Sequence, residues 1–206
     1  APPPDSKRYF NLCYEIWPGE VTTRTVDPGT GESLILDAAR RSRSEQLYQR
    51  AADIALQSRS GEYALAAAKA WQEDHPQSRE ANRYVLQILI ALNKVGETAG
   101  PLRQFIEQAP LPNRVGILSA VPQMYGRIAD KAAAVSAVKE AFKGELENRS
   151  TGAAAWISLG RLQLAADDKA ASLQSLAKAK AMDPTYEGQA RLALELMAEG
   201  ISAAEP

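Results

Sequence analysis

Cysteine and histidine are almost missing from this sequence of 206 residues, which contains one of each, Cys13 and His75. One cysteine cannot form a disulfide within the chain, and neither residue can build a metal site alone. We therefore expect no metal, no cofactor and no catalysis by a histidine or cysteine. Cys13 has the apolar neighbours of a buried helical side chain. His75, in the stretch EDHP, is expected in the last turn of a helix, with its ring near the terminal carbonyl groups.

The sequence also lacks an excess of charge of either sign, since it contains 24 Lys and Arg and 25 Asp and Glu, for a formal net charge of −1. A protein that binds nucleic acid usually carries a basic excess or a basic stripe. The longest apolar run, VLQILIALN at residues 85–93, is too short to cross a bilayer. The composition therefore argues against a nucleic-acid partner and against a membrane-spanning segment.

Residues 1–43 are predicted to form an irregular section with one or two helices. Apolar residues between Tyr9 and Trp17 follow helical spacing, residues 20–26 favour extended backbone, and DPGTG at residues 27–31 is typical of a turn. A helix is expected from about residue 32 to 41. Its mostly inward residues are Leu34, Leu36, Ala38 and Ala39.

The chain opens APPPDS without an initiator methionine. This is expected of a mature form after removal of a signal peptide, and equally of an expressed fragment. Cys13 is not at the amino terminus, so any lipid-modified cysteine that tethers the protein to a membrane is expected upstream of residue 1.

Residues 44–206 are predicted to be helical throughout, with short breaks between antiparallel helices. Ala, Leu, Gln, Glu, Lys and Arg dominate these segments, and no convincing strand appears among them. The expected helices are 45–58, 62–74, 79–93, 96–108, 113–128, 131–147, 152–166, 169–181 and 187–199. Pro122 falls inside one of them, where it predicts a kink or two shorter helices.

Prolines mark a repeat. Pro76 and Pro110 are about 34 residues apart, which is a known period of paired-helix repeats, and Pro184 follows after roughly two further units. One helix pair cannot bury its apolar face alone, so successive pairs stack and share a continuous core. The pattern predicts an all-α, right-handed superhelical solenoid of antiparallel helix pairs.

The stretch AWISLGRLQLAADDKAASLQSLAKAKAMDP, residues 155–184, resembles a tetratricopeptide repeat, a family with this same period. Gly160 is expected to let two helices approach closely, Trp156 to fill the gap between them, and Pro184 to end the second helix. Gln163 stands where the family has a first-helix tyrosine. The matching positions are Trp156, Leu159, Gly160, Ser172, Leu176, Ala179, Asp183 and Pro184.

Residues 33–200 also resemble the amino-terminal part of proteobacterial envelope proteins with tetratricopeptide repeats. These include outer-membrane lipoproteins that are partners of a periplasmic carboxyl-terminal-processing protease. The resemblance rests on the segment LYQRAADIAL and on the general pattern of expected helices. The resemblance implies a periplasmic location, associated with the outer membrane, and an envelope protease as the partner; a cytoplasmic location is the alternative. Apolar residues on more than one face of helix 187–199 suggest a longer solenoid, because an end cap should show a polar outer face.

Three features could indicate a more specific binding or catalytic function, and each also has a purely structural interpretation. The segment DPGTGES, residues 27–33, lacks the Lys-Ser/Thr pair of a phosphate-binding loop and has Glu32 instead, so a turn before a helix is favoured. The tryptophans Trp17, Trp71 and Trp156 could stack on a ligand, but at helical spacing among Ala and Leu they indicate core positions. The adjacent Asp167 and Asp168 fit a turn between helices and a helix start.

The first helices of a stacked solenoid line its concave face, and polar residues that packing does not need face that groove. The candidates for binding a partner are Gln49, Asp53, Arg83, Gln87 and Arg161. Arg83 and Gln87, one helical turn apart, loosely resemble the cation and amide with which some family members hold a peptide carboxylate. For each residue the alternative is a solvated helix face.

The leading function is therefore a non-catalytic scaffold or adaptor that binds a protein or an extended peptide on its concave face in the bacterial envelope. The alternative is a structural assembly subunit whose solenoid packs permanently against another chain or a missing carboxyl-terminal half. An enzyme is disfavoured, because no acid and base converge in the sequence.

Overall fold

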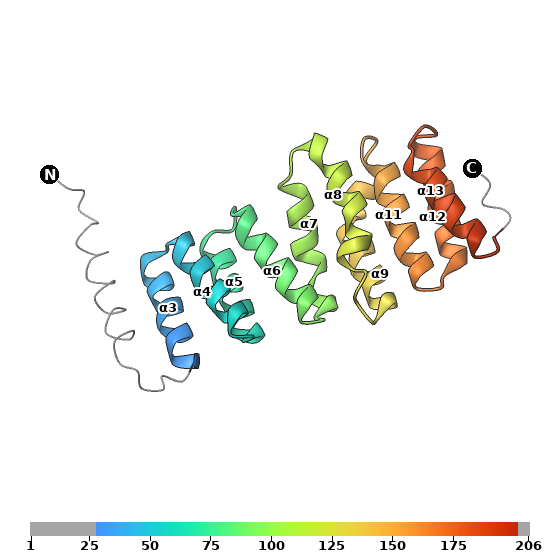
Figure 1. The fold of residues 1–206 in the computed structure, drawn as a ribbon. Helices are drawn as coiled ribbons and strands as arrows, with labels where there is room; N and C mark the ends of the chain where they lie inside the picture. The colour runs from blue at the N-terminus through green and yellow to red at the C-terminus, as the bar shows by residue number, and fades with distance from the viewer. Residues whose placement is uncertain (1–27, 202–206) are drawn as a thin grey trace. The chain divides into compact units, whose positions relative to one another are not determined.

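The structure is a computed structural model that describes residues 28–201, and these residues form helices and short connections without a strand (Figure 1). Cys13, Trp17 and the expected helix and extended segment before residue 28 lie outside the described residues. The helices are α3 (Pro28–Ser42), α4 (Glu45–Gln57), α5 (Gly61–Asp74), α6 (Arg79–Ala91), the 3-10 turn η1 (Val95–Glu97), α7 (Ala99–Glu107), α8 (Leu111–Met124), α9 (Lys131–Ala141), α10 (Lys143–Leu146), α11 (Gly152–Ala165), α12 (Lys169–Met182) and α13 (Gly188–Ala198). None of them is long and apolar enough to span a membrane.

The chain divides into two compact units, residues 1–85 and 86–206, which we call unit 1 and unit 2. In unit 1, α3 packs against α4 and α5, and the α5 side chain Trp71 is 2% exposed in the core. Alanines surround it: Ala51, Ala52, Ala67, Ala70 and Ala81 belong to the same buried cluster. Small side chains let these helices approach closely, and the core role predicted for Trp71 is confirmed. The expected boundary between residues 43 and 44 stays a prediction.

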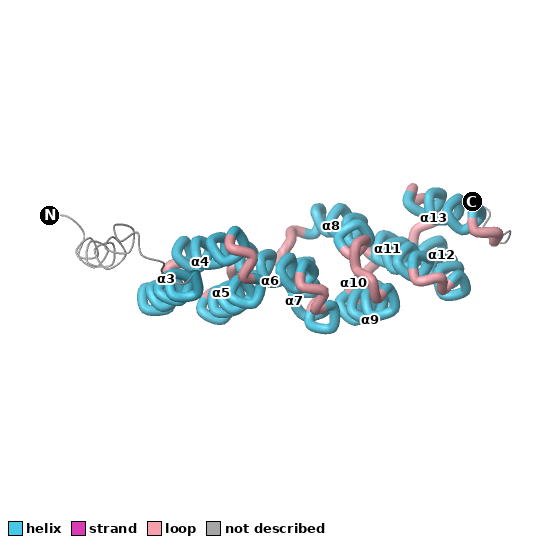
Figure 2. Tube along the Cα trace, turned by 60° about the horizontal axis from the view of Figure 1, so that its bottom comes forward, coloured by secondary structure: helices cyan, strands magenta, loops and turns pink. Residues whose placement is uncertain are grey.

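Unit 2 has two layers of helices. Figure 2 shows α8, α11 and α13 in one layer and α7, α9 and α12 in the other. Helix α11 lies in contact with α8, α9, α12 and α13, which explains why ten of its 14 residues are buried. The large side chains Leu102, Leu118, Tyr125, Phe142 and Leu159 fill the core of this unit.

Four helices, α4, α6, α11 and α13, end in the same way, which identifies the repeated unit in the backbone. The second residue after each helix has a positive φ, and the next amide donates to a carbonyl five residues earlier. This is the Schellman motif, which reverses the chain into the next helix. The positive-φ residues are Arg59, Asn93, Asp167 and Gly200. Arg59 and Asn93 are separated by the same interval as Pro76 and Pro110.

The all-α fold of antiparallel helix pairs, arranged as a helical solenoid, is confirmed. Asp168 is the N-cap of α12, its carboxylate accepting from the Ala171 amide at 3.0 Å, and Asp167 forms the turn, as predicted. The turn expected over residues 27–31 is wrong for residues 28–31, which the structure describes, because α3 begins at Pro28. Proline is well suited to the first helical position, where no hydrogen-bond donor is required.

Other differences are local. Leu34 is 57% exposed rather than inward, whereas Leu36, Ala38 and Ala39 are buried. The helix expected over 96–108 is interrupted at Thr98, whose hydroxyl donates to the Val95 carbonyl. The helix expected over 131–147 breaks at Phe142 into α9 and α10. Helix α8 is one helix that contains Pro122, so two shorter helices are excluded.

Candidate functional site

Two of the predicted binding residues, Gln49 and Asp53 on α4, meet at Tyr84 of α6. The Gln49 Nε2 atom donates to the Tyr84 hydroxyl at 3.2 Å, and this hydroxyl donates to Asp53 Oδ1 at 2.8 Å. The Tyr84 ring lies 5.5 Å from the Trp71 ring, between their centroids. Burial, followed by the hydrogen bond to Asp53, raises the pKa of Tyr84, while the bond from Gln49 lowers it. The neutral Tyr84 hydroxyl therefore holds both α4 side chains, accepting from Gln49 and donating to Asp53.

Arg83 is paired within its own helix. Its guanidinium forms an ion pair with Glu80, the Nε atom donating at 3.1 Å, and lies over the Tyr84 ring at 5.5 Å from the centroid. The hydrogen bond to Glu80 is the main cause of a raised Arg83 pKa. Gln87, one turn further along α6, is exposed. The structure thus brings Gln49, Asp53 and Arg83 together around Tyr84, a residue that sequence reasoning missed.

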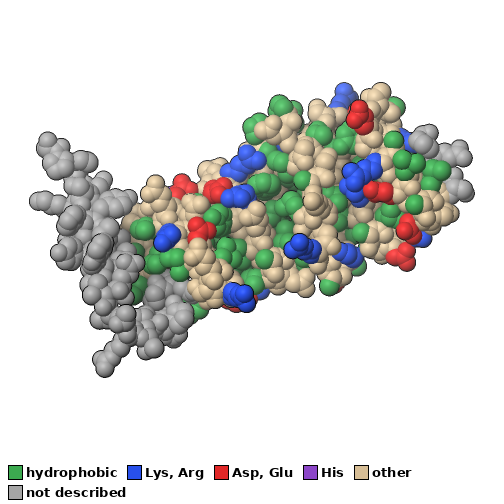
Figure 3. All heavy atoms as spheres, viewed as in Figure 1, with side chains coloured by type: hydrophobic (Ala, Val, Ile, Leu, Met, Phe, Trp, Pro, Cys, Tyr) green, Lys and Arg blue, Asp and Glu red, His purple; other side chains and the backbone are tan. Residues whose placement is uncertain are grey.

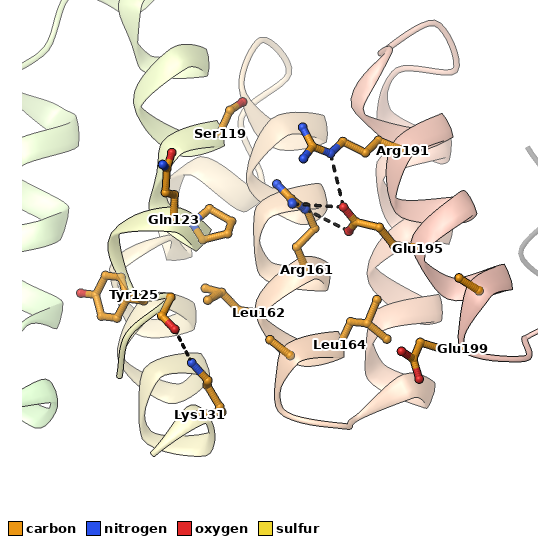
Figure 4. Close-up of a pocket in the computed structure, with 14 residues that line it drawn as sticks. Ser119, Gln123, Tyr125, Lys131, Arg161, Leu162, Leu164, Arg191, Glu195 and Glu199 are labelled. Atoms are coloured by element: carbon orange, nitrogen blue, oxygen red, sulfur yellow. Dashed lines mark hydrogen bonds and ion pairs between the residues drawn. The ribbon is translucent and has the colours of Figure 1, made fainter. Parts of the chain in front are cut away.

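A pocket of about 840 Å³ opens in unit 2 between α8, α11 and α13, with a contribution from α9 (Figure 4). We call it the α8–α11–α13 pocket. Of the predicted binding residues, Arg161 is the one that lines it. The lining residues are Ser119, Pro122, Gln123, Tyr125, Gly126, Lys131, Arg161, Leu162, Leu164, Ala165, Arg191, Glu195, Ala198 and Glu199.

The charged side of the pocket consists of two arginines that share one carboxylate. Arg161 donates through Nε to Glu195 Oε2 at 3.0 Å and through a terminal nitrogen to Oε1 at 3.1 Å. Arg191 Nε donates to Glu195 Oε1 at 3.3 Å. The Arg191 side chain is 71% exposed, and Figure 4 shows its guanidinium group directed toward that of Arg161. Two cations and one anion leave a local charge of +1 on this side.

Apart from Lys131 and Glu199, the remaining lining is apolar or neutral. Leu162, Leu164 and Ala165 of α11 form apolar lining, while Gln123 of α8 is exposed. Lys131 donates to the Gly126 carbonyl at 2.7 Å, which holds the start of α9 against the end of α8. On the face drawn in Figure 3, basic and acidic side chains adjoin in the region of α11. Such a lining suits a ligand with carboxylates and apolar side chains.

The repeat-motif residues lie around α11 and α12. Leu159 and Ala179 are fully buried, and Pro184 follows Asp183, which ends α12 in extended backbone. Gly160 faces α12, where an added Cβ would lie 3.2 Å from Ser175 Cβ. Trp156 is half-buried between two core clusters; its indole N–H donates to the Leu146 carbonyl at 3.1 Å, and Lys178 lies 4.1 Å over its ring.

His75 follows the last residue of α5 directly. Its Nε2 atom lies 2.9 Å from the carbonyl oxygen of Arg43, in the α3–α4 connection, rather than from a carbonyl of α5. Its Nδ1 atom lies 4.0 Å from Glu45 Oε1. Among the described residues no group of histidine, cysteine and carboxylate side chains could hold a metal ion. The position of His75 is that of a side chain tying two connections together.

A scan against protein-family models and a search of curated proteins find no match to this chain. Among solved structures, similar folds include MamA 41-end from Desulfovibrio magneticus RS-1, with 16% identity, 78% of this chain and 88% of that chain covered, and a TM-score of 0.39. PilW, a widely conserved type IV pilus biogenesis factor, has 16% identity, with 94% of this chain and 86% of that chain covered, and a TM-score of 0.41. At such identities and scores these similarities carry nothing about the function or partners of this chain.

Proposed function

We propose that this chain is a non-catalytic scaffold that binds an extended segment of a protein partner in the α8–α11–α13 pocket. The observation that carries the proposal is the lining, with Arg161 and Arg191 on one side and the leucines of α11 beneath. Guanidinium groups bind carboxylates through parallel hydrogen bonds, and apolar lining accepts side chains of an extended peptide. Affinity would come from many modest contacts along the groove.

The proposed binding surface is the concave face that first helices line in a stacked solenoid. The further residues proposed for it are Gln49, Asp53, Arg83 and Gln87. In unit 1 the anchoring of Gln49 and Asp53 by Tyr84 supports a preorganised polar surface, because side chains already held in place lose little freedom on binding. Arg83 would contribute its charge only after exchanging Glu80 for a ligand carboxylate.

Site-specific photo-crosslinking tests this function. A benzophenone amino acid at Gln123, which is exposed in the pocket, is expected to form covalent adducts with a partner in extract of cells that produce the protein. The matched control carries the same amino acid at Ala177, which is exposed on α12 outside the pocket. Mass spectrometry of the adducts identifies the partner.

The Arg161→Gln, Arg191→Gln double variant completes this experiment. Loss of the Gln123 adducts in the variant supports recognition of an acidic segment by the two guanidinium groups. Adducts of equal yield from Gln123 and Ala177, or adducts unchanged in the double variant, contradict the proposed site.

We also propose a periplasmic location with outer-membrane association, and an envelope protease as the partner, on the strength of the sequence resemblance of residues 33–200. Cell fractionation beside a periplasmic marker separates this location from the cytoplasmic alternative. The assembly-subunit alternative is favoured by one observation, the exposure of Leu194 and Met197 on α13. A monomeric mass for the full chain in gel filtration at high concentration would count against permanent self-association.

A further inference from the structure

Helix α13 repeats the positions of α11 at the interval that separates Arg161 from Glu195, which is 34 residues. Every buried residue of α13 follows a buried residue of α11 by this interval. The equivalent pairs are Ala155 and Gln189, Ser158 and Leu192, Leu159 and Ala193, and Leu162 and Leu196. The ion pair between Arg161 and Glu195 therefore joins equivalent positions. Helix α13 is a first helix of a repeat, and the face it buries is the one that α11 presents to α8 and α9.

The other face of α11 is covered by its second helix, α12. Ile157, Gly160 and Gln163 are buried on this face. The Ser172 hydroxyl donates to the Gly160 carbonyl at 2.8 Å, and the Ser175 hydroxyl donates to Gln163 Oε1 at 2.6 Å. Glycine on one helix and serines on the other allow the close approach of the pair.

The equivalent face of α13 is open within residues 28–201. Its residues are Arg191, Leu194 and Met197, of which Leu194 is 59% exposed and Met197 43%. The two apolar side chains lie one turn apart on one side of the helix. Singly exposed leucines are common on protein surfaces, but these two stand at positions that a second helix buries in the preceding repeat.

This open face continues an existing interface. The cluster formed by α11, α12 and α13 contains Ile157, Leu176, Leu192, Ala193 and Leu196. The partly buried Leu173 of α12 and Ile201, which follows α13, pack against this cluster. Figures 1 and 2 both show α13 beside α12. A helix laid against α13 would therefore extend a packed core.

We propose that the outer face of α13, formed by Leu194 and Met197, docks an amphipathic α-helix of a partner protein, in the position that α12 takes against α11. The inference does not depend on the α8–α11–α13 pocket. Leu194 replaces Gly160, so the docked helix presents small residues opposite it. Met197 replaces Gln163 and offers no amide acceptor, so the residue opposite is apolar.

The α12 sequence itself supplies the probe. A fluorescent peptide of residues 169–182 is stabilised as a helix by a lactam between Lys178 and the carboxylate of Gln174→Glu, both exposed on α12. Fluorescence anisotropy with the full chain is expected to show saturable binding. A second peptide with Ser175→Ala is expected to bind at least about threefold more tightly, because its apolar side chain meets Met197 without an unpaired hydroxyl.

The protein variant Leu194→Gln, Met197→Gln is expected to weaken binding of both peptides about tenfold or more. Leu56→Gln, at a leucine 42% exposed on α4, is the matched control and should leave binding unchanged. Circular dichroism verifies that both variants are folded. Absence of saturable binding to the parent chain, or equal binding to the double variant, overturns the proposal. A concentration-dependent dimer that disappears in the double variant would also overturn it, since the occupant would be a second copy.

Discussion

The hydroxyl of Ser158 on α11 donates a hydrogen bond of 2.7 Å to the carbonyl oxygen of Leu118 on α8. Leu118 lies four residues before Pro122, and in a regular helix its carbonyl would accept from the amide of that residue. Proline has no N–H, so this buried carbonyl needs another donor. A serine from the neighbouring helix supplies it, which is how α8 tolerates a proline within its length.

Ser158→Ala is therefore expected to destabilise the protein by about 1–3 kcal/mol, the cost of leaving a buried carbonyl without a partner. Urea unfolding followed by circular dichroism measures the change. In the Pro122→Ala background the backbone donor returns, so the same Ser158→Ala change should cost clearly less. Equal costs in both backgrounds would show that the two residues are not coupled.

A second relationship holds the α7–α8 corner to α10. The Arg114 guanidinium donates to Glu145 at 2.9 Å, to the Glu107 carbonyl at 2.9 Å and to the Ala109 carbonyl at 3.1 Å. Thr151 donates to the other oxygen of the Glu145 carboxylate. Since the Glu145 side chain is only 8% exposed, the pair neutralises a carboxylate that would otherwise be buried alone.

Arg114→Met is expected to lower the free energy of unfolding by about 3–5 kcal/mol, because it leaves the buried Glu145 charge without its cation. The control is Arg103→Met, which removes a half-exposed pair with Glu140 and should cost under about 1 kcal/mol. Adding Glu145→Gln to Arg114→Met should recover part of the loss. A loss of similar size for Arg103→Met and Arg114→Met would contradict the importance of burial.

The helical framework could be predicted from sequence because it follows local signals. Alanine-rich helix faces, the regularly spaced prolines and the Asp168 cap each determine the backbone within a few residues of their own positions. The side-chain partners could not be read in that way. Tyr84 joins residues 31 and 35 positions earlier, and Glu195 lies 34 residues after Arg161, so each pairing depends on how repeats stack. Arg114 and Glu145 form their pair in the least regular segment, where no repeat template applies.

The Glu45 carboxylate should make the stability of unit 1 depend on pH. Hydrogen bonds from Ser78 and then from Trp71 lower the pKa of Glu45 below its ordinary range. A lowered pKa in the folded state contributes stability that is present above the unfolded value, about 4.3, and is lost as the pH falls through the folded value. Urea unfolding between pH 7 and 3 should therefore show a smaller acid-induced loss in Glu45→Gln than in the parent chain. An identical pH profile in both proteins would contradict the role of Glu45, and Ser78→Ala should give an intermediate profile.

Gly160 is a position at which the packing of α11 against α12 and α13 is sensitive to side-chain size. A Cβ there would lie 2.7 Å from Leu192 Cδ2 and 3.2 Å from Ser175 Cβ, so the Leu192 side chain must move for any substitution, and a side chain as large as leucine must displace α12 or α13. Gly160→Leu is expected to destabilise the protein by about 1–3 kcal/mol through overpacking. Gly116 is an exposed glycine inside α8, and a Cβ added there would meet no neighbouring atom within 4 Å. Gly116→Leu should therefore raise stability by about 0.5–1 kcal/mol through helix propensity. Opposite signs in thermal unfolding of the two variants would establish that Gly160 is needed for close helix packing, whereas a gain in both would place α12 further from α11 than the structure has it.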